Sequence, residues 1–395
     1  MRVILFTGKG GVGKTSVSAA TALASAATGA RTLVMSTDPA HSLADSFDIE
    51  LAAHPVTIQP GLDAVQLDAQ ARLEDNWREI QEYLIALLRW SGIGEVQAEE
   101  LSVLPGLEEI FSLIDVHDHA RAGTYDVIVV DCAPTAETLR LLSLPDALGW
   151  YMERIFPVER KIARVVRPML GQMTSMPLPD DGLHGSVERL YRNLEQVRDL
   201  LGDGQTTSVR LVTNPERMVM AEARRTYTYL SLFGYHVDAV VVNRMIPDEV
   251  RDPWFDQWKA RQAEHMDHLA ESFGDLPVLT APLLDDEVVG VDRLATLAAQ
   301  LYAGDKPQGV LSTGSPLIFE PVEDGWLLSL ALPFVSKADV EAFNRGDELY
   351  VKVGSYTRSL VLPTVLRHSQ ILRAGLVNGR LDVYFEHTKL HAQPR

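Results

Sequence analysis

The chain has 395 residues, 46% of them hydrophobic and 23% charged, which is typical of a globular protein with room for one large and one small domain. Its formal net charge of -18 disfavours nucleic acid and anionic lipid as partners. The only cysteine, Cys132, excludes internal disulfides, iron–sulfur clusters and Cys-x-x-Cys zinc sites. We therefore expect a reducing, cytoplasmic setting, with no membrane-spanning segment and no signal peptide.

The first elements predict the opening unit of a parallel sheet. Arg2–Thr7 is a short apolar strand that leads into a Gly-rich turn and a helical stretch, Thr15–Ala27. Gly29 ends that helix, and Arg31–Ser36 forms a second strand. Strand, loop, helix and strand in this order are the start of a doubly wound α/β fold.

Further apolar strands, of the kind that parallel sheets bury on both faces, follow along the chain. They are Tyr125–Val130, Ser208–Val212, Ala239–Val242 and the shorter Pro277–Leu279. Two helical patterns, in Asn76–Trp90 and Arg160–Met173, are not needed to complete the sheet. They predict a helical subdomain at about residues 70–120 and 145–205 of an α/β domain that spans 1–303.

The composition changes after Tyr302. Residues 304–316 are rich in Gly, Pro, Ser and Thr and are interpreted as a linker. Short strands separated by turn residues follow, at Leu317–Phe319, Trp326–Leu332, Glu348–Val353, Ser359–Leu362 and Arg380–Glu386. Residues 317–390 are therefore expected to form a small all-β sandwich.

The Gly-rich turn has the pattern of a phosphate-binding loop, or P-loop. Its backbone N–H groups and the start of the helix can cradle phosphate oxygens. Lys14 is placed to reach the β and γ phosphates, and the Thr15 hydroxyl to bind Mg²⁺. The candidate nucleotide-binding residues are Gly8, Lys9, Gly10, Gly11, Val12, Gly13, Lys14, Thr15 and Ser16.

Three further residues are candidates for the chemistry. Asp131 closes an apolar strand, where a carboxylate can hold Mg²⁺ through water. Asp38 follows the second strand and could orient or deprotonate an attacking water, although it could also open a turn before Pro39. Lys9 could reach charge that develops on a transferring phosphate, the alternative being an ordinary surface lysine.

Several motifs together resemble the family of arsenical-pump ATPases and tail-anchored-protein targeting ATPases. In chain order they are Lys9–Thr15, the segment 38–43 (DPAHSL), 105–109 (PGLEE), 131–140 (DCAPTAETLR), 243–244 (NR) and 282–287 (PLLDDE). The resemblance covers about residues 1–303.

The resemblance implies a Mg²⁺-dependent ATPase that forms a homodimer around paired nucleotides, with Lys9 acting on the partner's nucleotide. It makes Asp38 the water-positioning carboxylate, places Asp131 in a switch segment, and assigns Asn243 to adenine, with Pro282 near the base. An asparagine amide offers a donor and an acceptor, which suits adenine. Without the family resemblance, Asn243 could equally be a turn residue at the end of a strand.

Departures from the family pattern limit what is carried over. Ser42 stands where the family often has Asn, and Ala136-Glu137 where it has Gly-His. One cysteine cannot supply the cysteine triad of metalloid-activated members, nor the zinc-binding Cys-x-x-Cys of eukaryotic targeting ATPases. Neither zinc nor an iron–sulfur cluster is therefore expected beside ATP and Mg²⁺.

The C-terminal segment resembles an α-crystallin (small heat-shock) domain. The resemblance depends on residues 330–333 (LALP), 360–363 (LVLP) and 378–383 (NGRLDV). No Ile-x-Ile motif follows His387, which makes large assemblies a weaker expectation.

The functional hypothesis is an ATPase that couples nucleotide to the capture and release of an apolar client protein or helix. Met152, Met169, Met173 and Met176, in or beside the second helical insert, suit a groove for such a client. An apolar helix stripe is more often core or a dimer contact, and only the family resemblance gives the groove equal weight. The alternatives are an ATPase that drives metalloid (arsenite) export, and a chaperone that uses ATP only as a structural switch.

Overall fold

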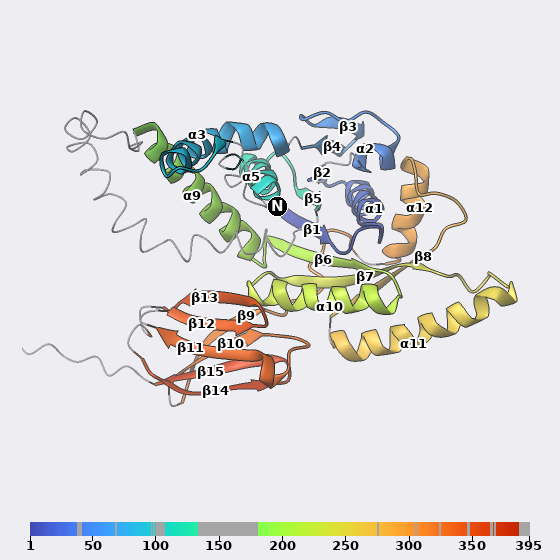
Figure 1. Cartoon of the computed structure of the whole chain (residues 1–395). Coiled ribbons are helices and arrows are strands. Elements are labelled where there is room, and N and C mark those ends of the chain that lie inside the picture. The colour runs from blue at the N-terminus through green and yellow to red at the C-terminus, as the bar shows by residue number, and fades with distance from the viewer. Residues whose placement is uncertain are drawn as a thin grey trace, which may run out of the picture. The chain divides into compact units, whose positions relative to one another are not determined.

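The computed structural model describes residues 1–37, 42–67, 69–95, 97, 99, 107–132, 181–274, 276–304, 306–323, 325–345, 348–363, 366 and 369–386. The chain divides into two compact units (Figure 1). The first consists of Met1–Gln66, Ala122–Ala133 and Leu201–Arg395, and the second of Leu67–Arg121 and Pro134–Leu200.

An eight-stranded sheet in the order β3-β4-β2-β5-β1-β6-β7-β8 forms the centre of the first unit. Neighbouring strands run parallel except at the edge, where β3 is antiparallel to β4. This confirms the predicted mostly parallel α/β sheet. The strands are β1 (Arg2–Thr7), β2 (Thr32–Ser36), β3 (Val56–Gln59), β4 (Leu62–Gln66), β5 (Val127–Asp131), β6 (Thr207–Thr213), β7 (Val237–Met245) and β8 (Val278–Pro282).

Helices of the first unit cover this sheet. They are α1 (Lys14–Ala27), α2 (Ser42–Phe47), α10 (Arg217–Leu232), α11 (Asp256–Phe273) and α12 (Val291–Leu301), with a short 3₁₀ turn, η2 (Pro253–Phe255). The buried face of α1 consists largely of alanines and small hydroxyl residues, which let the helix approach the sheet closely. Because α1 begins directly after the Gly-rich loop, this packing fixes the loop against the sheet.

Most predicted strands differ by a few residues at their ends from the observed ones, and two differences bear on the site. The strand β5 begins two residues later than the sequence pattern indicated, and it includes Asp131 as its last residue. The strand β6, which the pattern presented as apolar, carries Arg210, whose side chain is completely buried. A charged side chain in this position requires partners, because burying an unpaired charge costs several kcal/mol.

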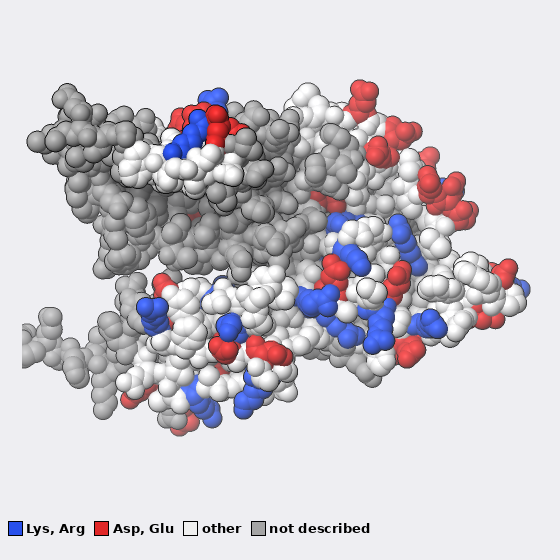
Figure 2. Space-filling view, viewed as in Figure 1, with Lys and Arg blue, Asp and Glu red and all other residues white. Residues whose placement is uncertain are grey.

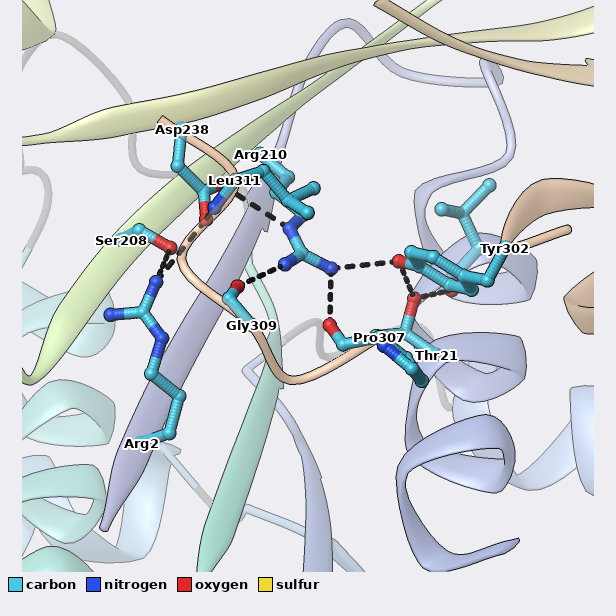
Figure 3. Close-up of polar contacts among 10 residues, drawn as sticks. Arg2, Thr21, Ser208, Arg210, Asp238, Tyr302, Pro307, Gly309 and Leu311 are labelled. Atoms are coloured by element: carbon cyan, nitrogen blue, oxygen red, sulfur yellow. Dashed lines mark hydrogen bonds and ion pairs between the residues drawn. The ribbon is translucent and has the colours of Figure 1, made fainter. Parts of the chain in front are cut away.

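Two of the partners of Arg210, Pro307 and Gly309, come from the segment predicted as a linker (Figure 3). Its guanidinium donates to the carbonyl oxygens of Pro307 at 2.7 Å and Gly309 at 3.0 Å, and to the Tyr302 hydroxyl at 2.8 Å. The Asp238 carboxylate, 3.3 Å from Arg210, also accepts from the Leu311 backbone at 3.3 Å. The chain between α12 and the C-terminal strands is therefore tied to the sheet at this end.

Asp238 bridges two buried arginines, because Arg2 donates to it at 3.2 Å from the neighbouring side. Two nitrogens of Arg2 have no hydrogen-bond partner among the described residues, and burial lowers the pKa of this guanidinium. On the other side, the Tyr302 hydroxyl lies 2.7 Å from the Thr21 hydroxyl of α1. One carboxylate thus balances two buried positive charges in a network that reaches the P-loop helix.

The C-terminal part of the first unit contains a four-stranded antiparallel sheet, β14-β15-β10-β9, and a three-stranded antiparallel sheet, β11-β12-β13. Alternate residues of β12 and β15 are buried, as expected of strands with one face in a core. The predicted C-terminal all-β region is confirmed. Its strands are β9 (Leu317–Val322), β10 (Gly325–Ala331), β11 (Val340–Arg345), β12 (Glu348–Val353), β13 (Tyr356–Val361), β14 (Ile371–Val377) and β15 (Arg380–Glu386), with a 3₁₀ turn, η3 (Lys337–Asp339).

The second unit consists of helices in its described part: α3 (Ala69–Trp90), α5 (Leu107–Ala122) and α9 (Asp181–Gly202). Helix α3 extends the predicted helix Asn76–Trp90 by two turns at its start. The other predicted helix, Arg160–Met173, and the methionines 152, 169, 173 and 176 lie outside the described residues. The predicted client groove and the predicted domain boundaries therefore stay predictions. Of the helices described here, none is long and apolar enough to cross a membrane.

Candidate nucleotide-binding site

The Gly-rich loop joins β1 to α1 at the centre of the sheet. Its backbone takes positive φ angles at Gly8 (153°), Gly11 (81°) and Gly13 (92°), which residues with a side chain adopt only with strain. A Cβ atom at Gly8 would overlap the carbonyl oxygen of Val212, and one at Gly13 would overlap the side chain of Asn243. The glycines thus allow a compact loop that neighbouring strands hold closely, as a phosphate cradle requires.

The two lysines of the loop lie at its two ends, Lys9 near its start and Lys14 at the first residue of α1. The Lys14 ammonium lies 3.4 Å from the carbonyl oxygen of Lys9, so its side chain folds back over the loop rather than extending into solvent. The first turn of α1 begins with Lys14, Thr15 and Ser16, and Val17 N donates to Gly13 O at 3.0 Å. Unpaired N–H groups and the positive end of a helix dipole are therefore aimed at this loop.

The carboxyl ends of three neighbouring strands meet beside the loop. Asp131 of β5 pairs in register with Phe6 of β1 on one side and with Ser36 of β2 on the other. Thr37 N donates to Asp131 O at 3.1 Å, which joins the chain leaving β2 to the end of β5. The Asp131 side chain is buried. Asp38, the predicted water-positioning residue, follows Thr37 directly but lies outside the described residues.

Cys132 follows Asp131 and is fully buried, with its N–H donating to Phe6 O at 3.1 Å. Burial raises the pKa of the thiol well above its usual range, and the neighbouring Asp131 charge raises it further. A buried thiol of this kind acts as a small packing residue.

A pocket of about 480 Å³ lies beside the start of α1. Four of the predicted nucleotide-binding residues line it: Gly13, Ser16, Asn243 and Pro282. The other predicted residues of the loop, together with Lys14, Thr15 and Asp131, do not line this pocket but lie in the loop and at the adjoining strand ends. The arrangement separates a pocket suited to a base and sugar from a loop suited to phosphates.

Asn243 connects the two parts. Its side-chain nitrogen donates to Val12 O at 2.9 Å, and its side-chain oxygen accepts from Arg244 N at 2.9 Å. An asparagine amide has two donors and can accept twice, so one donor and one acceptor site are left for a ligand. The side chain can therefore brace the loop and still contact a base.

Sequence reasoning did not assign several of the residues that form this pocket. Arg244 has a left-handed backbone, with φ 61°, which is uncommon for a non-glycine residue and is found often at functional sites. The far wall is supplied by Asp45, Ser46 and the segment 283–289. Gly290 N donates to Ser46 O at 2.9 Å and so closes the segment onto α2, a contact between distant positions that leaves no local sequence signal.

The charge of the visible face is unevenly distributed. Figure 2 shows several Lys and Arg side chains over α10, interspersed with a few acidic ones, whereas acidic side chains gather over α2 and the segment before α12. The exposed basic residues of α10 include Arg217 and Arg225. A basic region near the loop favours the approach of an anion such as a polyphosphate, despite the net charge of -18 for the whole chain.

Gly13→Ala is expected to impair nucleotide binding strongly, because the new methyl group overlaps Asn243 and the backbone φ of 92° disfavours any side chain. Gly29→Ala is the matched control, since Gly29 has a φ of 90° but nothing within 4 Å of the added Cβ. Titration with a fluorescent ATP analogue measures both. Equal loss of affinity in the two variants would show that backbone strain alone, and not the loop geometry, is responsible.

No group of three or more His, Cys, Asp or Glu arranged to hold a metal ion occurs in the described part of the chain. An ion held mainly by nucleotide phosphates, with one hydroxyl and one carboxylate from the protein, does not need such a group. The Thr15 and Asp131 pair fits that kind of site.

Comparison with known proteins identifies two regions. The family model described as anion-transporting ATPase matches residues 1–303, and the model of an HSP20-like domain found in ArsA matches residues 323–385. "Putative arsenical pump-driving ATPase 1" of Aquifex aeolicus is 38% identical over 97% of this chain and 100% of its own length. "Putative arsenical pump-driving ATPase" of Chlorobaculum tepidum is 40% identical over 99% of this chain and 95% of its own length.

Proposed function

Because the chain belongs to the anion-transporting ATPase family and carries the HSP20-like domain found in ArsA, we propose that it is a Mg²⁺-dependent ATPase whose nucleotide-bound homodimer captures and releases an apolar client. The family supports ATP hydrolysis itself. The metal, the dimer, the client and the role of each residue are parts of the proposal.

The loop between β1 and α1 is the observation that supports the proposal most directly. A Cβ atom at Gly8 or Gly13 would overlap Val212 or Asn243, so the glycines let the loop lie close to the strands, and the Lys14 side chain folds back over the loop. In this arrangement the backbone N–H groups bind the phosphates, and Lys14 offsets their negative charge. Asn243 and Pro282 line the adjoining pocket and would contact the adenine.

Thr15 and Asp131 are the residues that would hold Mg²⁺, Asp131 through water. The ion would neutralise negative charge on the phosphates as the bond to the leaving group breaks. The buried position of Asp131, between the ends of β1 and β2, keeps its carboxylate at the edge of the sheet where the loop lies. Asp38 would orient the attacking water, so that proton transfer and phosphate binding are divided between different residues.

Asp38→Asn is expected to abolish steady-state ATP hydrolysis and to leave ATP binding almost unchanged, because the amide keeps the size of the side chain but is a poor proton acceptor. Phosphate release measures turnover, and equilibrium titration measures binding. Asp48→Asn, an exposed position just after α2, is the control and should hydrolyse ATP at the wild-type rate. Wild-type turnover by the Asp38 variant would remove Asp38 from the mechanism.

The HSP20-like domain supports the proposed binding of a client, because this domain and the ATPase region belong to the same polypeptide. An ATPase cycle with two conformations of a dimer could alternately expose and cover apolar surface. The test is co-purification of an apolar helix with the ATP-loaded Asp38→Asn variant. Loss of the bound peptide on exchange to ADP is expected, and equal retention with either nucleotide would contradict the coupling.

Metalloid export is the second candidate, because the similar proteins from Aquifex aeolicus and Chlorobaculum tepidum are named as arsenical pump-driving ATPases. The chain has a single cysteine, which is buried, and one thiol cannot supply the cysteine triad of metalloid-activated ATPases. We therefore expect the rate of ATP hydrolysis to be unchanged by arsenite. Stimulation of turnover by arsenite would favour this second function.

A further inference from the structure

Lys9, at the start of the loop, is paired with an acidic residue outside the predicted site. Its ammonium lies 3.8 Å from the Glu222 carboxylate of α10, and the side chains are 39% and 42% exposed. Glu222 is the only acidic residue in α10. The contact turns Lys9 towards α10, although its proposed role requires it to meet phosphate.

The helix that carries Glu222 is fixed by the C-terminal strands. The Thr228 hydroxyl donates to Pro333 O at 2.5 Å, and the Arg358 guanidinium donates to Leu232 O at the end of α10. The ring of Tyr229 lies 4.2 Å from that of Tyr356. These contacts hold the second half of α10 in place, about two turns from Glu222.

Phe334 adds an aromatic anchor to the same contact. Its ring lies 6.1 Å from Tyr227, 5.1 Å from Phe273 and 5.8 Å from the guanidinium carbon of Arg224. The backbone of Phe334 has a φ of 64°, a costly conformation for a bulky residue that persists only where its surroundings impose it. Glu222 is therefore carried by a braced helix, and Lys9, with its flexible side chain, is the partner that can move.

We propose that Glu222 is a positioning residue that holds Lys9 in the nucleotide-free chain and gives it up when nucleotide phosphates compete for the ammonium. This inference rests on the proposed role of Lys9 at the phosphates. It also gives the C-terminal domain a function within the ATPase, since bracing α10 keeps Glu222 at the loop. The ion pair is half exposed, so its effect is modest, up to about fivefold in an equilibrium constant.

A double-mutant cycle tests this inference. The dissociation constant for MgATP is measured for the full-length wild type, Glu222→Gln, Lys9→Met and the double variant, and kcat and KM are measured where turnover occurs. Glu222→Gln is expected to tighten MgATP binding by about two- to fivefold and to lower KM more than it changes kcat. In the Lys9→Met background the same change should have little effect, because the ammonium is absent.

Glu216→Gln is the matched control, since Glu216 is exposed at the residue before α10 and its loss removes the same charge. Its effect is expected to be smaller and equal in both Lys9 backgrounds. Glu222→Asp should restore binding towards the wild-type value, and raising the salt concentration should reduce the effect of Glu222→Gln. An equal effect of Glu222→Gln with and without Lys9 would overturn the inference.

The experiments distinguish a wrong role for Glu222 from a wrong proposed function. Binding of MgATP can be measured without turnover. A chain that binds but does not hydrolyse ATP would contradict the proposed function, and the double-mutant cycle on binding could still be measured. Normal hydrolysis with an additive cycle would contradict only the role of Glu222.

Discussion

Lys14→Met is expected to lower the rate of ATP hydrolysis by at least about 10²-fold and to weaken ATP binding. The side chain keeps most of its length but loses the positive charge, which in the structure lies over the loop, 3.4 Å from the Lys9 carbonyl oxygen. A charge that stabilises phosphate in the transition state contributes about 10²- to 10³-fold to the rate when it is removed. Phosphate release under saturating ATP gives the turnover number.

Lys337→Met is the control, because Lys337 lies exposed in η3 and its substitution removes the same charge from the chain. Its turnover number should equal that of the wild type. Retention of more than a tenth of the wild-type rate in Lys14→Met would mean that the loop does not hold the phosphates as proposed.

Asp238→Asn is expected to be the most destabilising single change in the first unit, by about 3 kcal/mol or more. Asp238 is the carboxylate between two buried guanidinium groups, Arg2 at 3.2 Å and Arg210 at 3.3 Å. An amide of the same size leaves both positive charges buried without a counterion. It also weakens the acceptor of Leu311 N, so the chain that leads to the C-terminal strands should loosen. Thermal denaturation followed by circular dichroism measures the change.

Asp126→Asn is the matched control, because Asp126 also accepts from an arginine, Arg31, at 2.8 Å, but on the surface. The hydrogen bond from Arg31 holds the pKa of Asp126 at about 2, so the carboxylate is charged throughout the pH range of the experiment. Solvent screens this pair, and its loss should lower the midpoint of unfolding far less. Equal shifts for the two variants would show that the buried network does not carry the predicted energy.

The phosphate loop and the sheet could be predicted from the sequence because their signals are local. The loop is one uninterrupted segment, Gly8–Thr15, and the geometry of phosphate binding explains why glycines and lysines stand at these positions. Strands buried on both faces are continuous apolar runs, so β1, β2 and β7 stand out. The strands β3, β11 and β14 did not stand out because they are short or half exposed, and their pattern mixes polar with apolar residues.

The features that could not be predicted depend on contacts between distant positions. Arg210 is a single charge inside a strand, and its partners Tyr302 and Gly309 follow 92 and 99 residues later. Nothing in the composition of residues 304–316 indicates that the backbone carbonyls of Pro307 and Gly309 bind a buried guanidinium. The pairing of Lys9 with Glu222 is hidden for the same reason, since α10 reaches the loop only through the arrangement of the sheet.

Whether two chains complete each other's nucleotide site is tested most directly by mixing two inactive variants. Lys9→Met leaves Asp38 intact, and Asp38→Asn leaves Lys9 intact. In a mixed dimer one of the two sites then has both groups, so an equal mixture should recover about a quarter of the wild-type turnover. If Lys9 acts only on the nucleotide of its own chain, the mixture will be as inactive as its components, and that result would contradict the shared site.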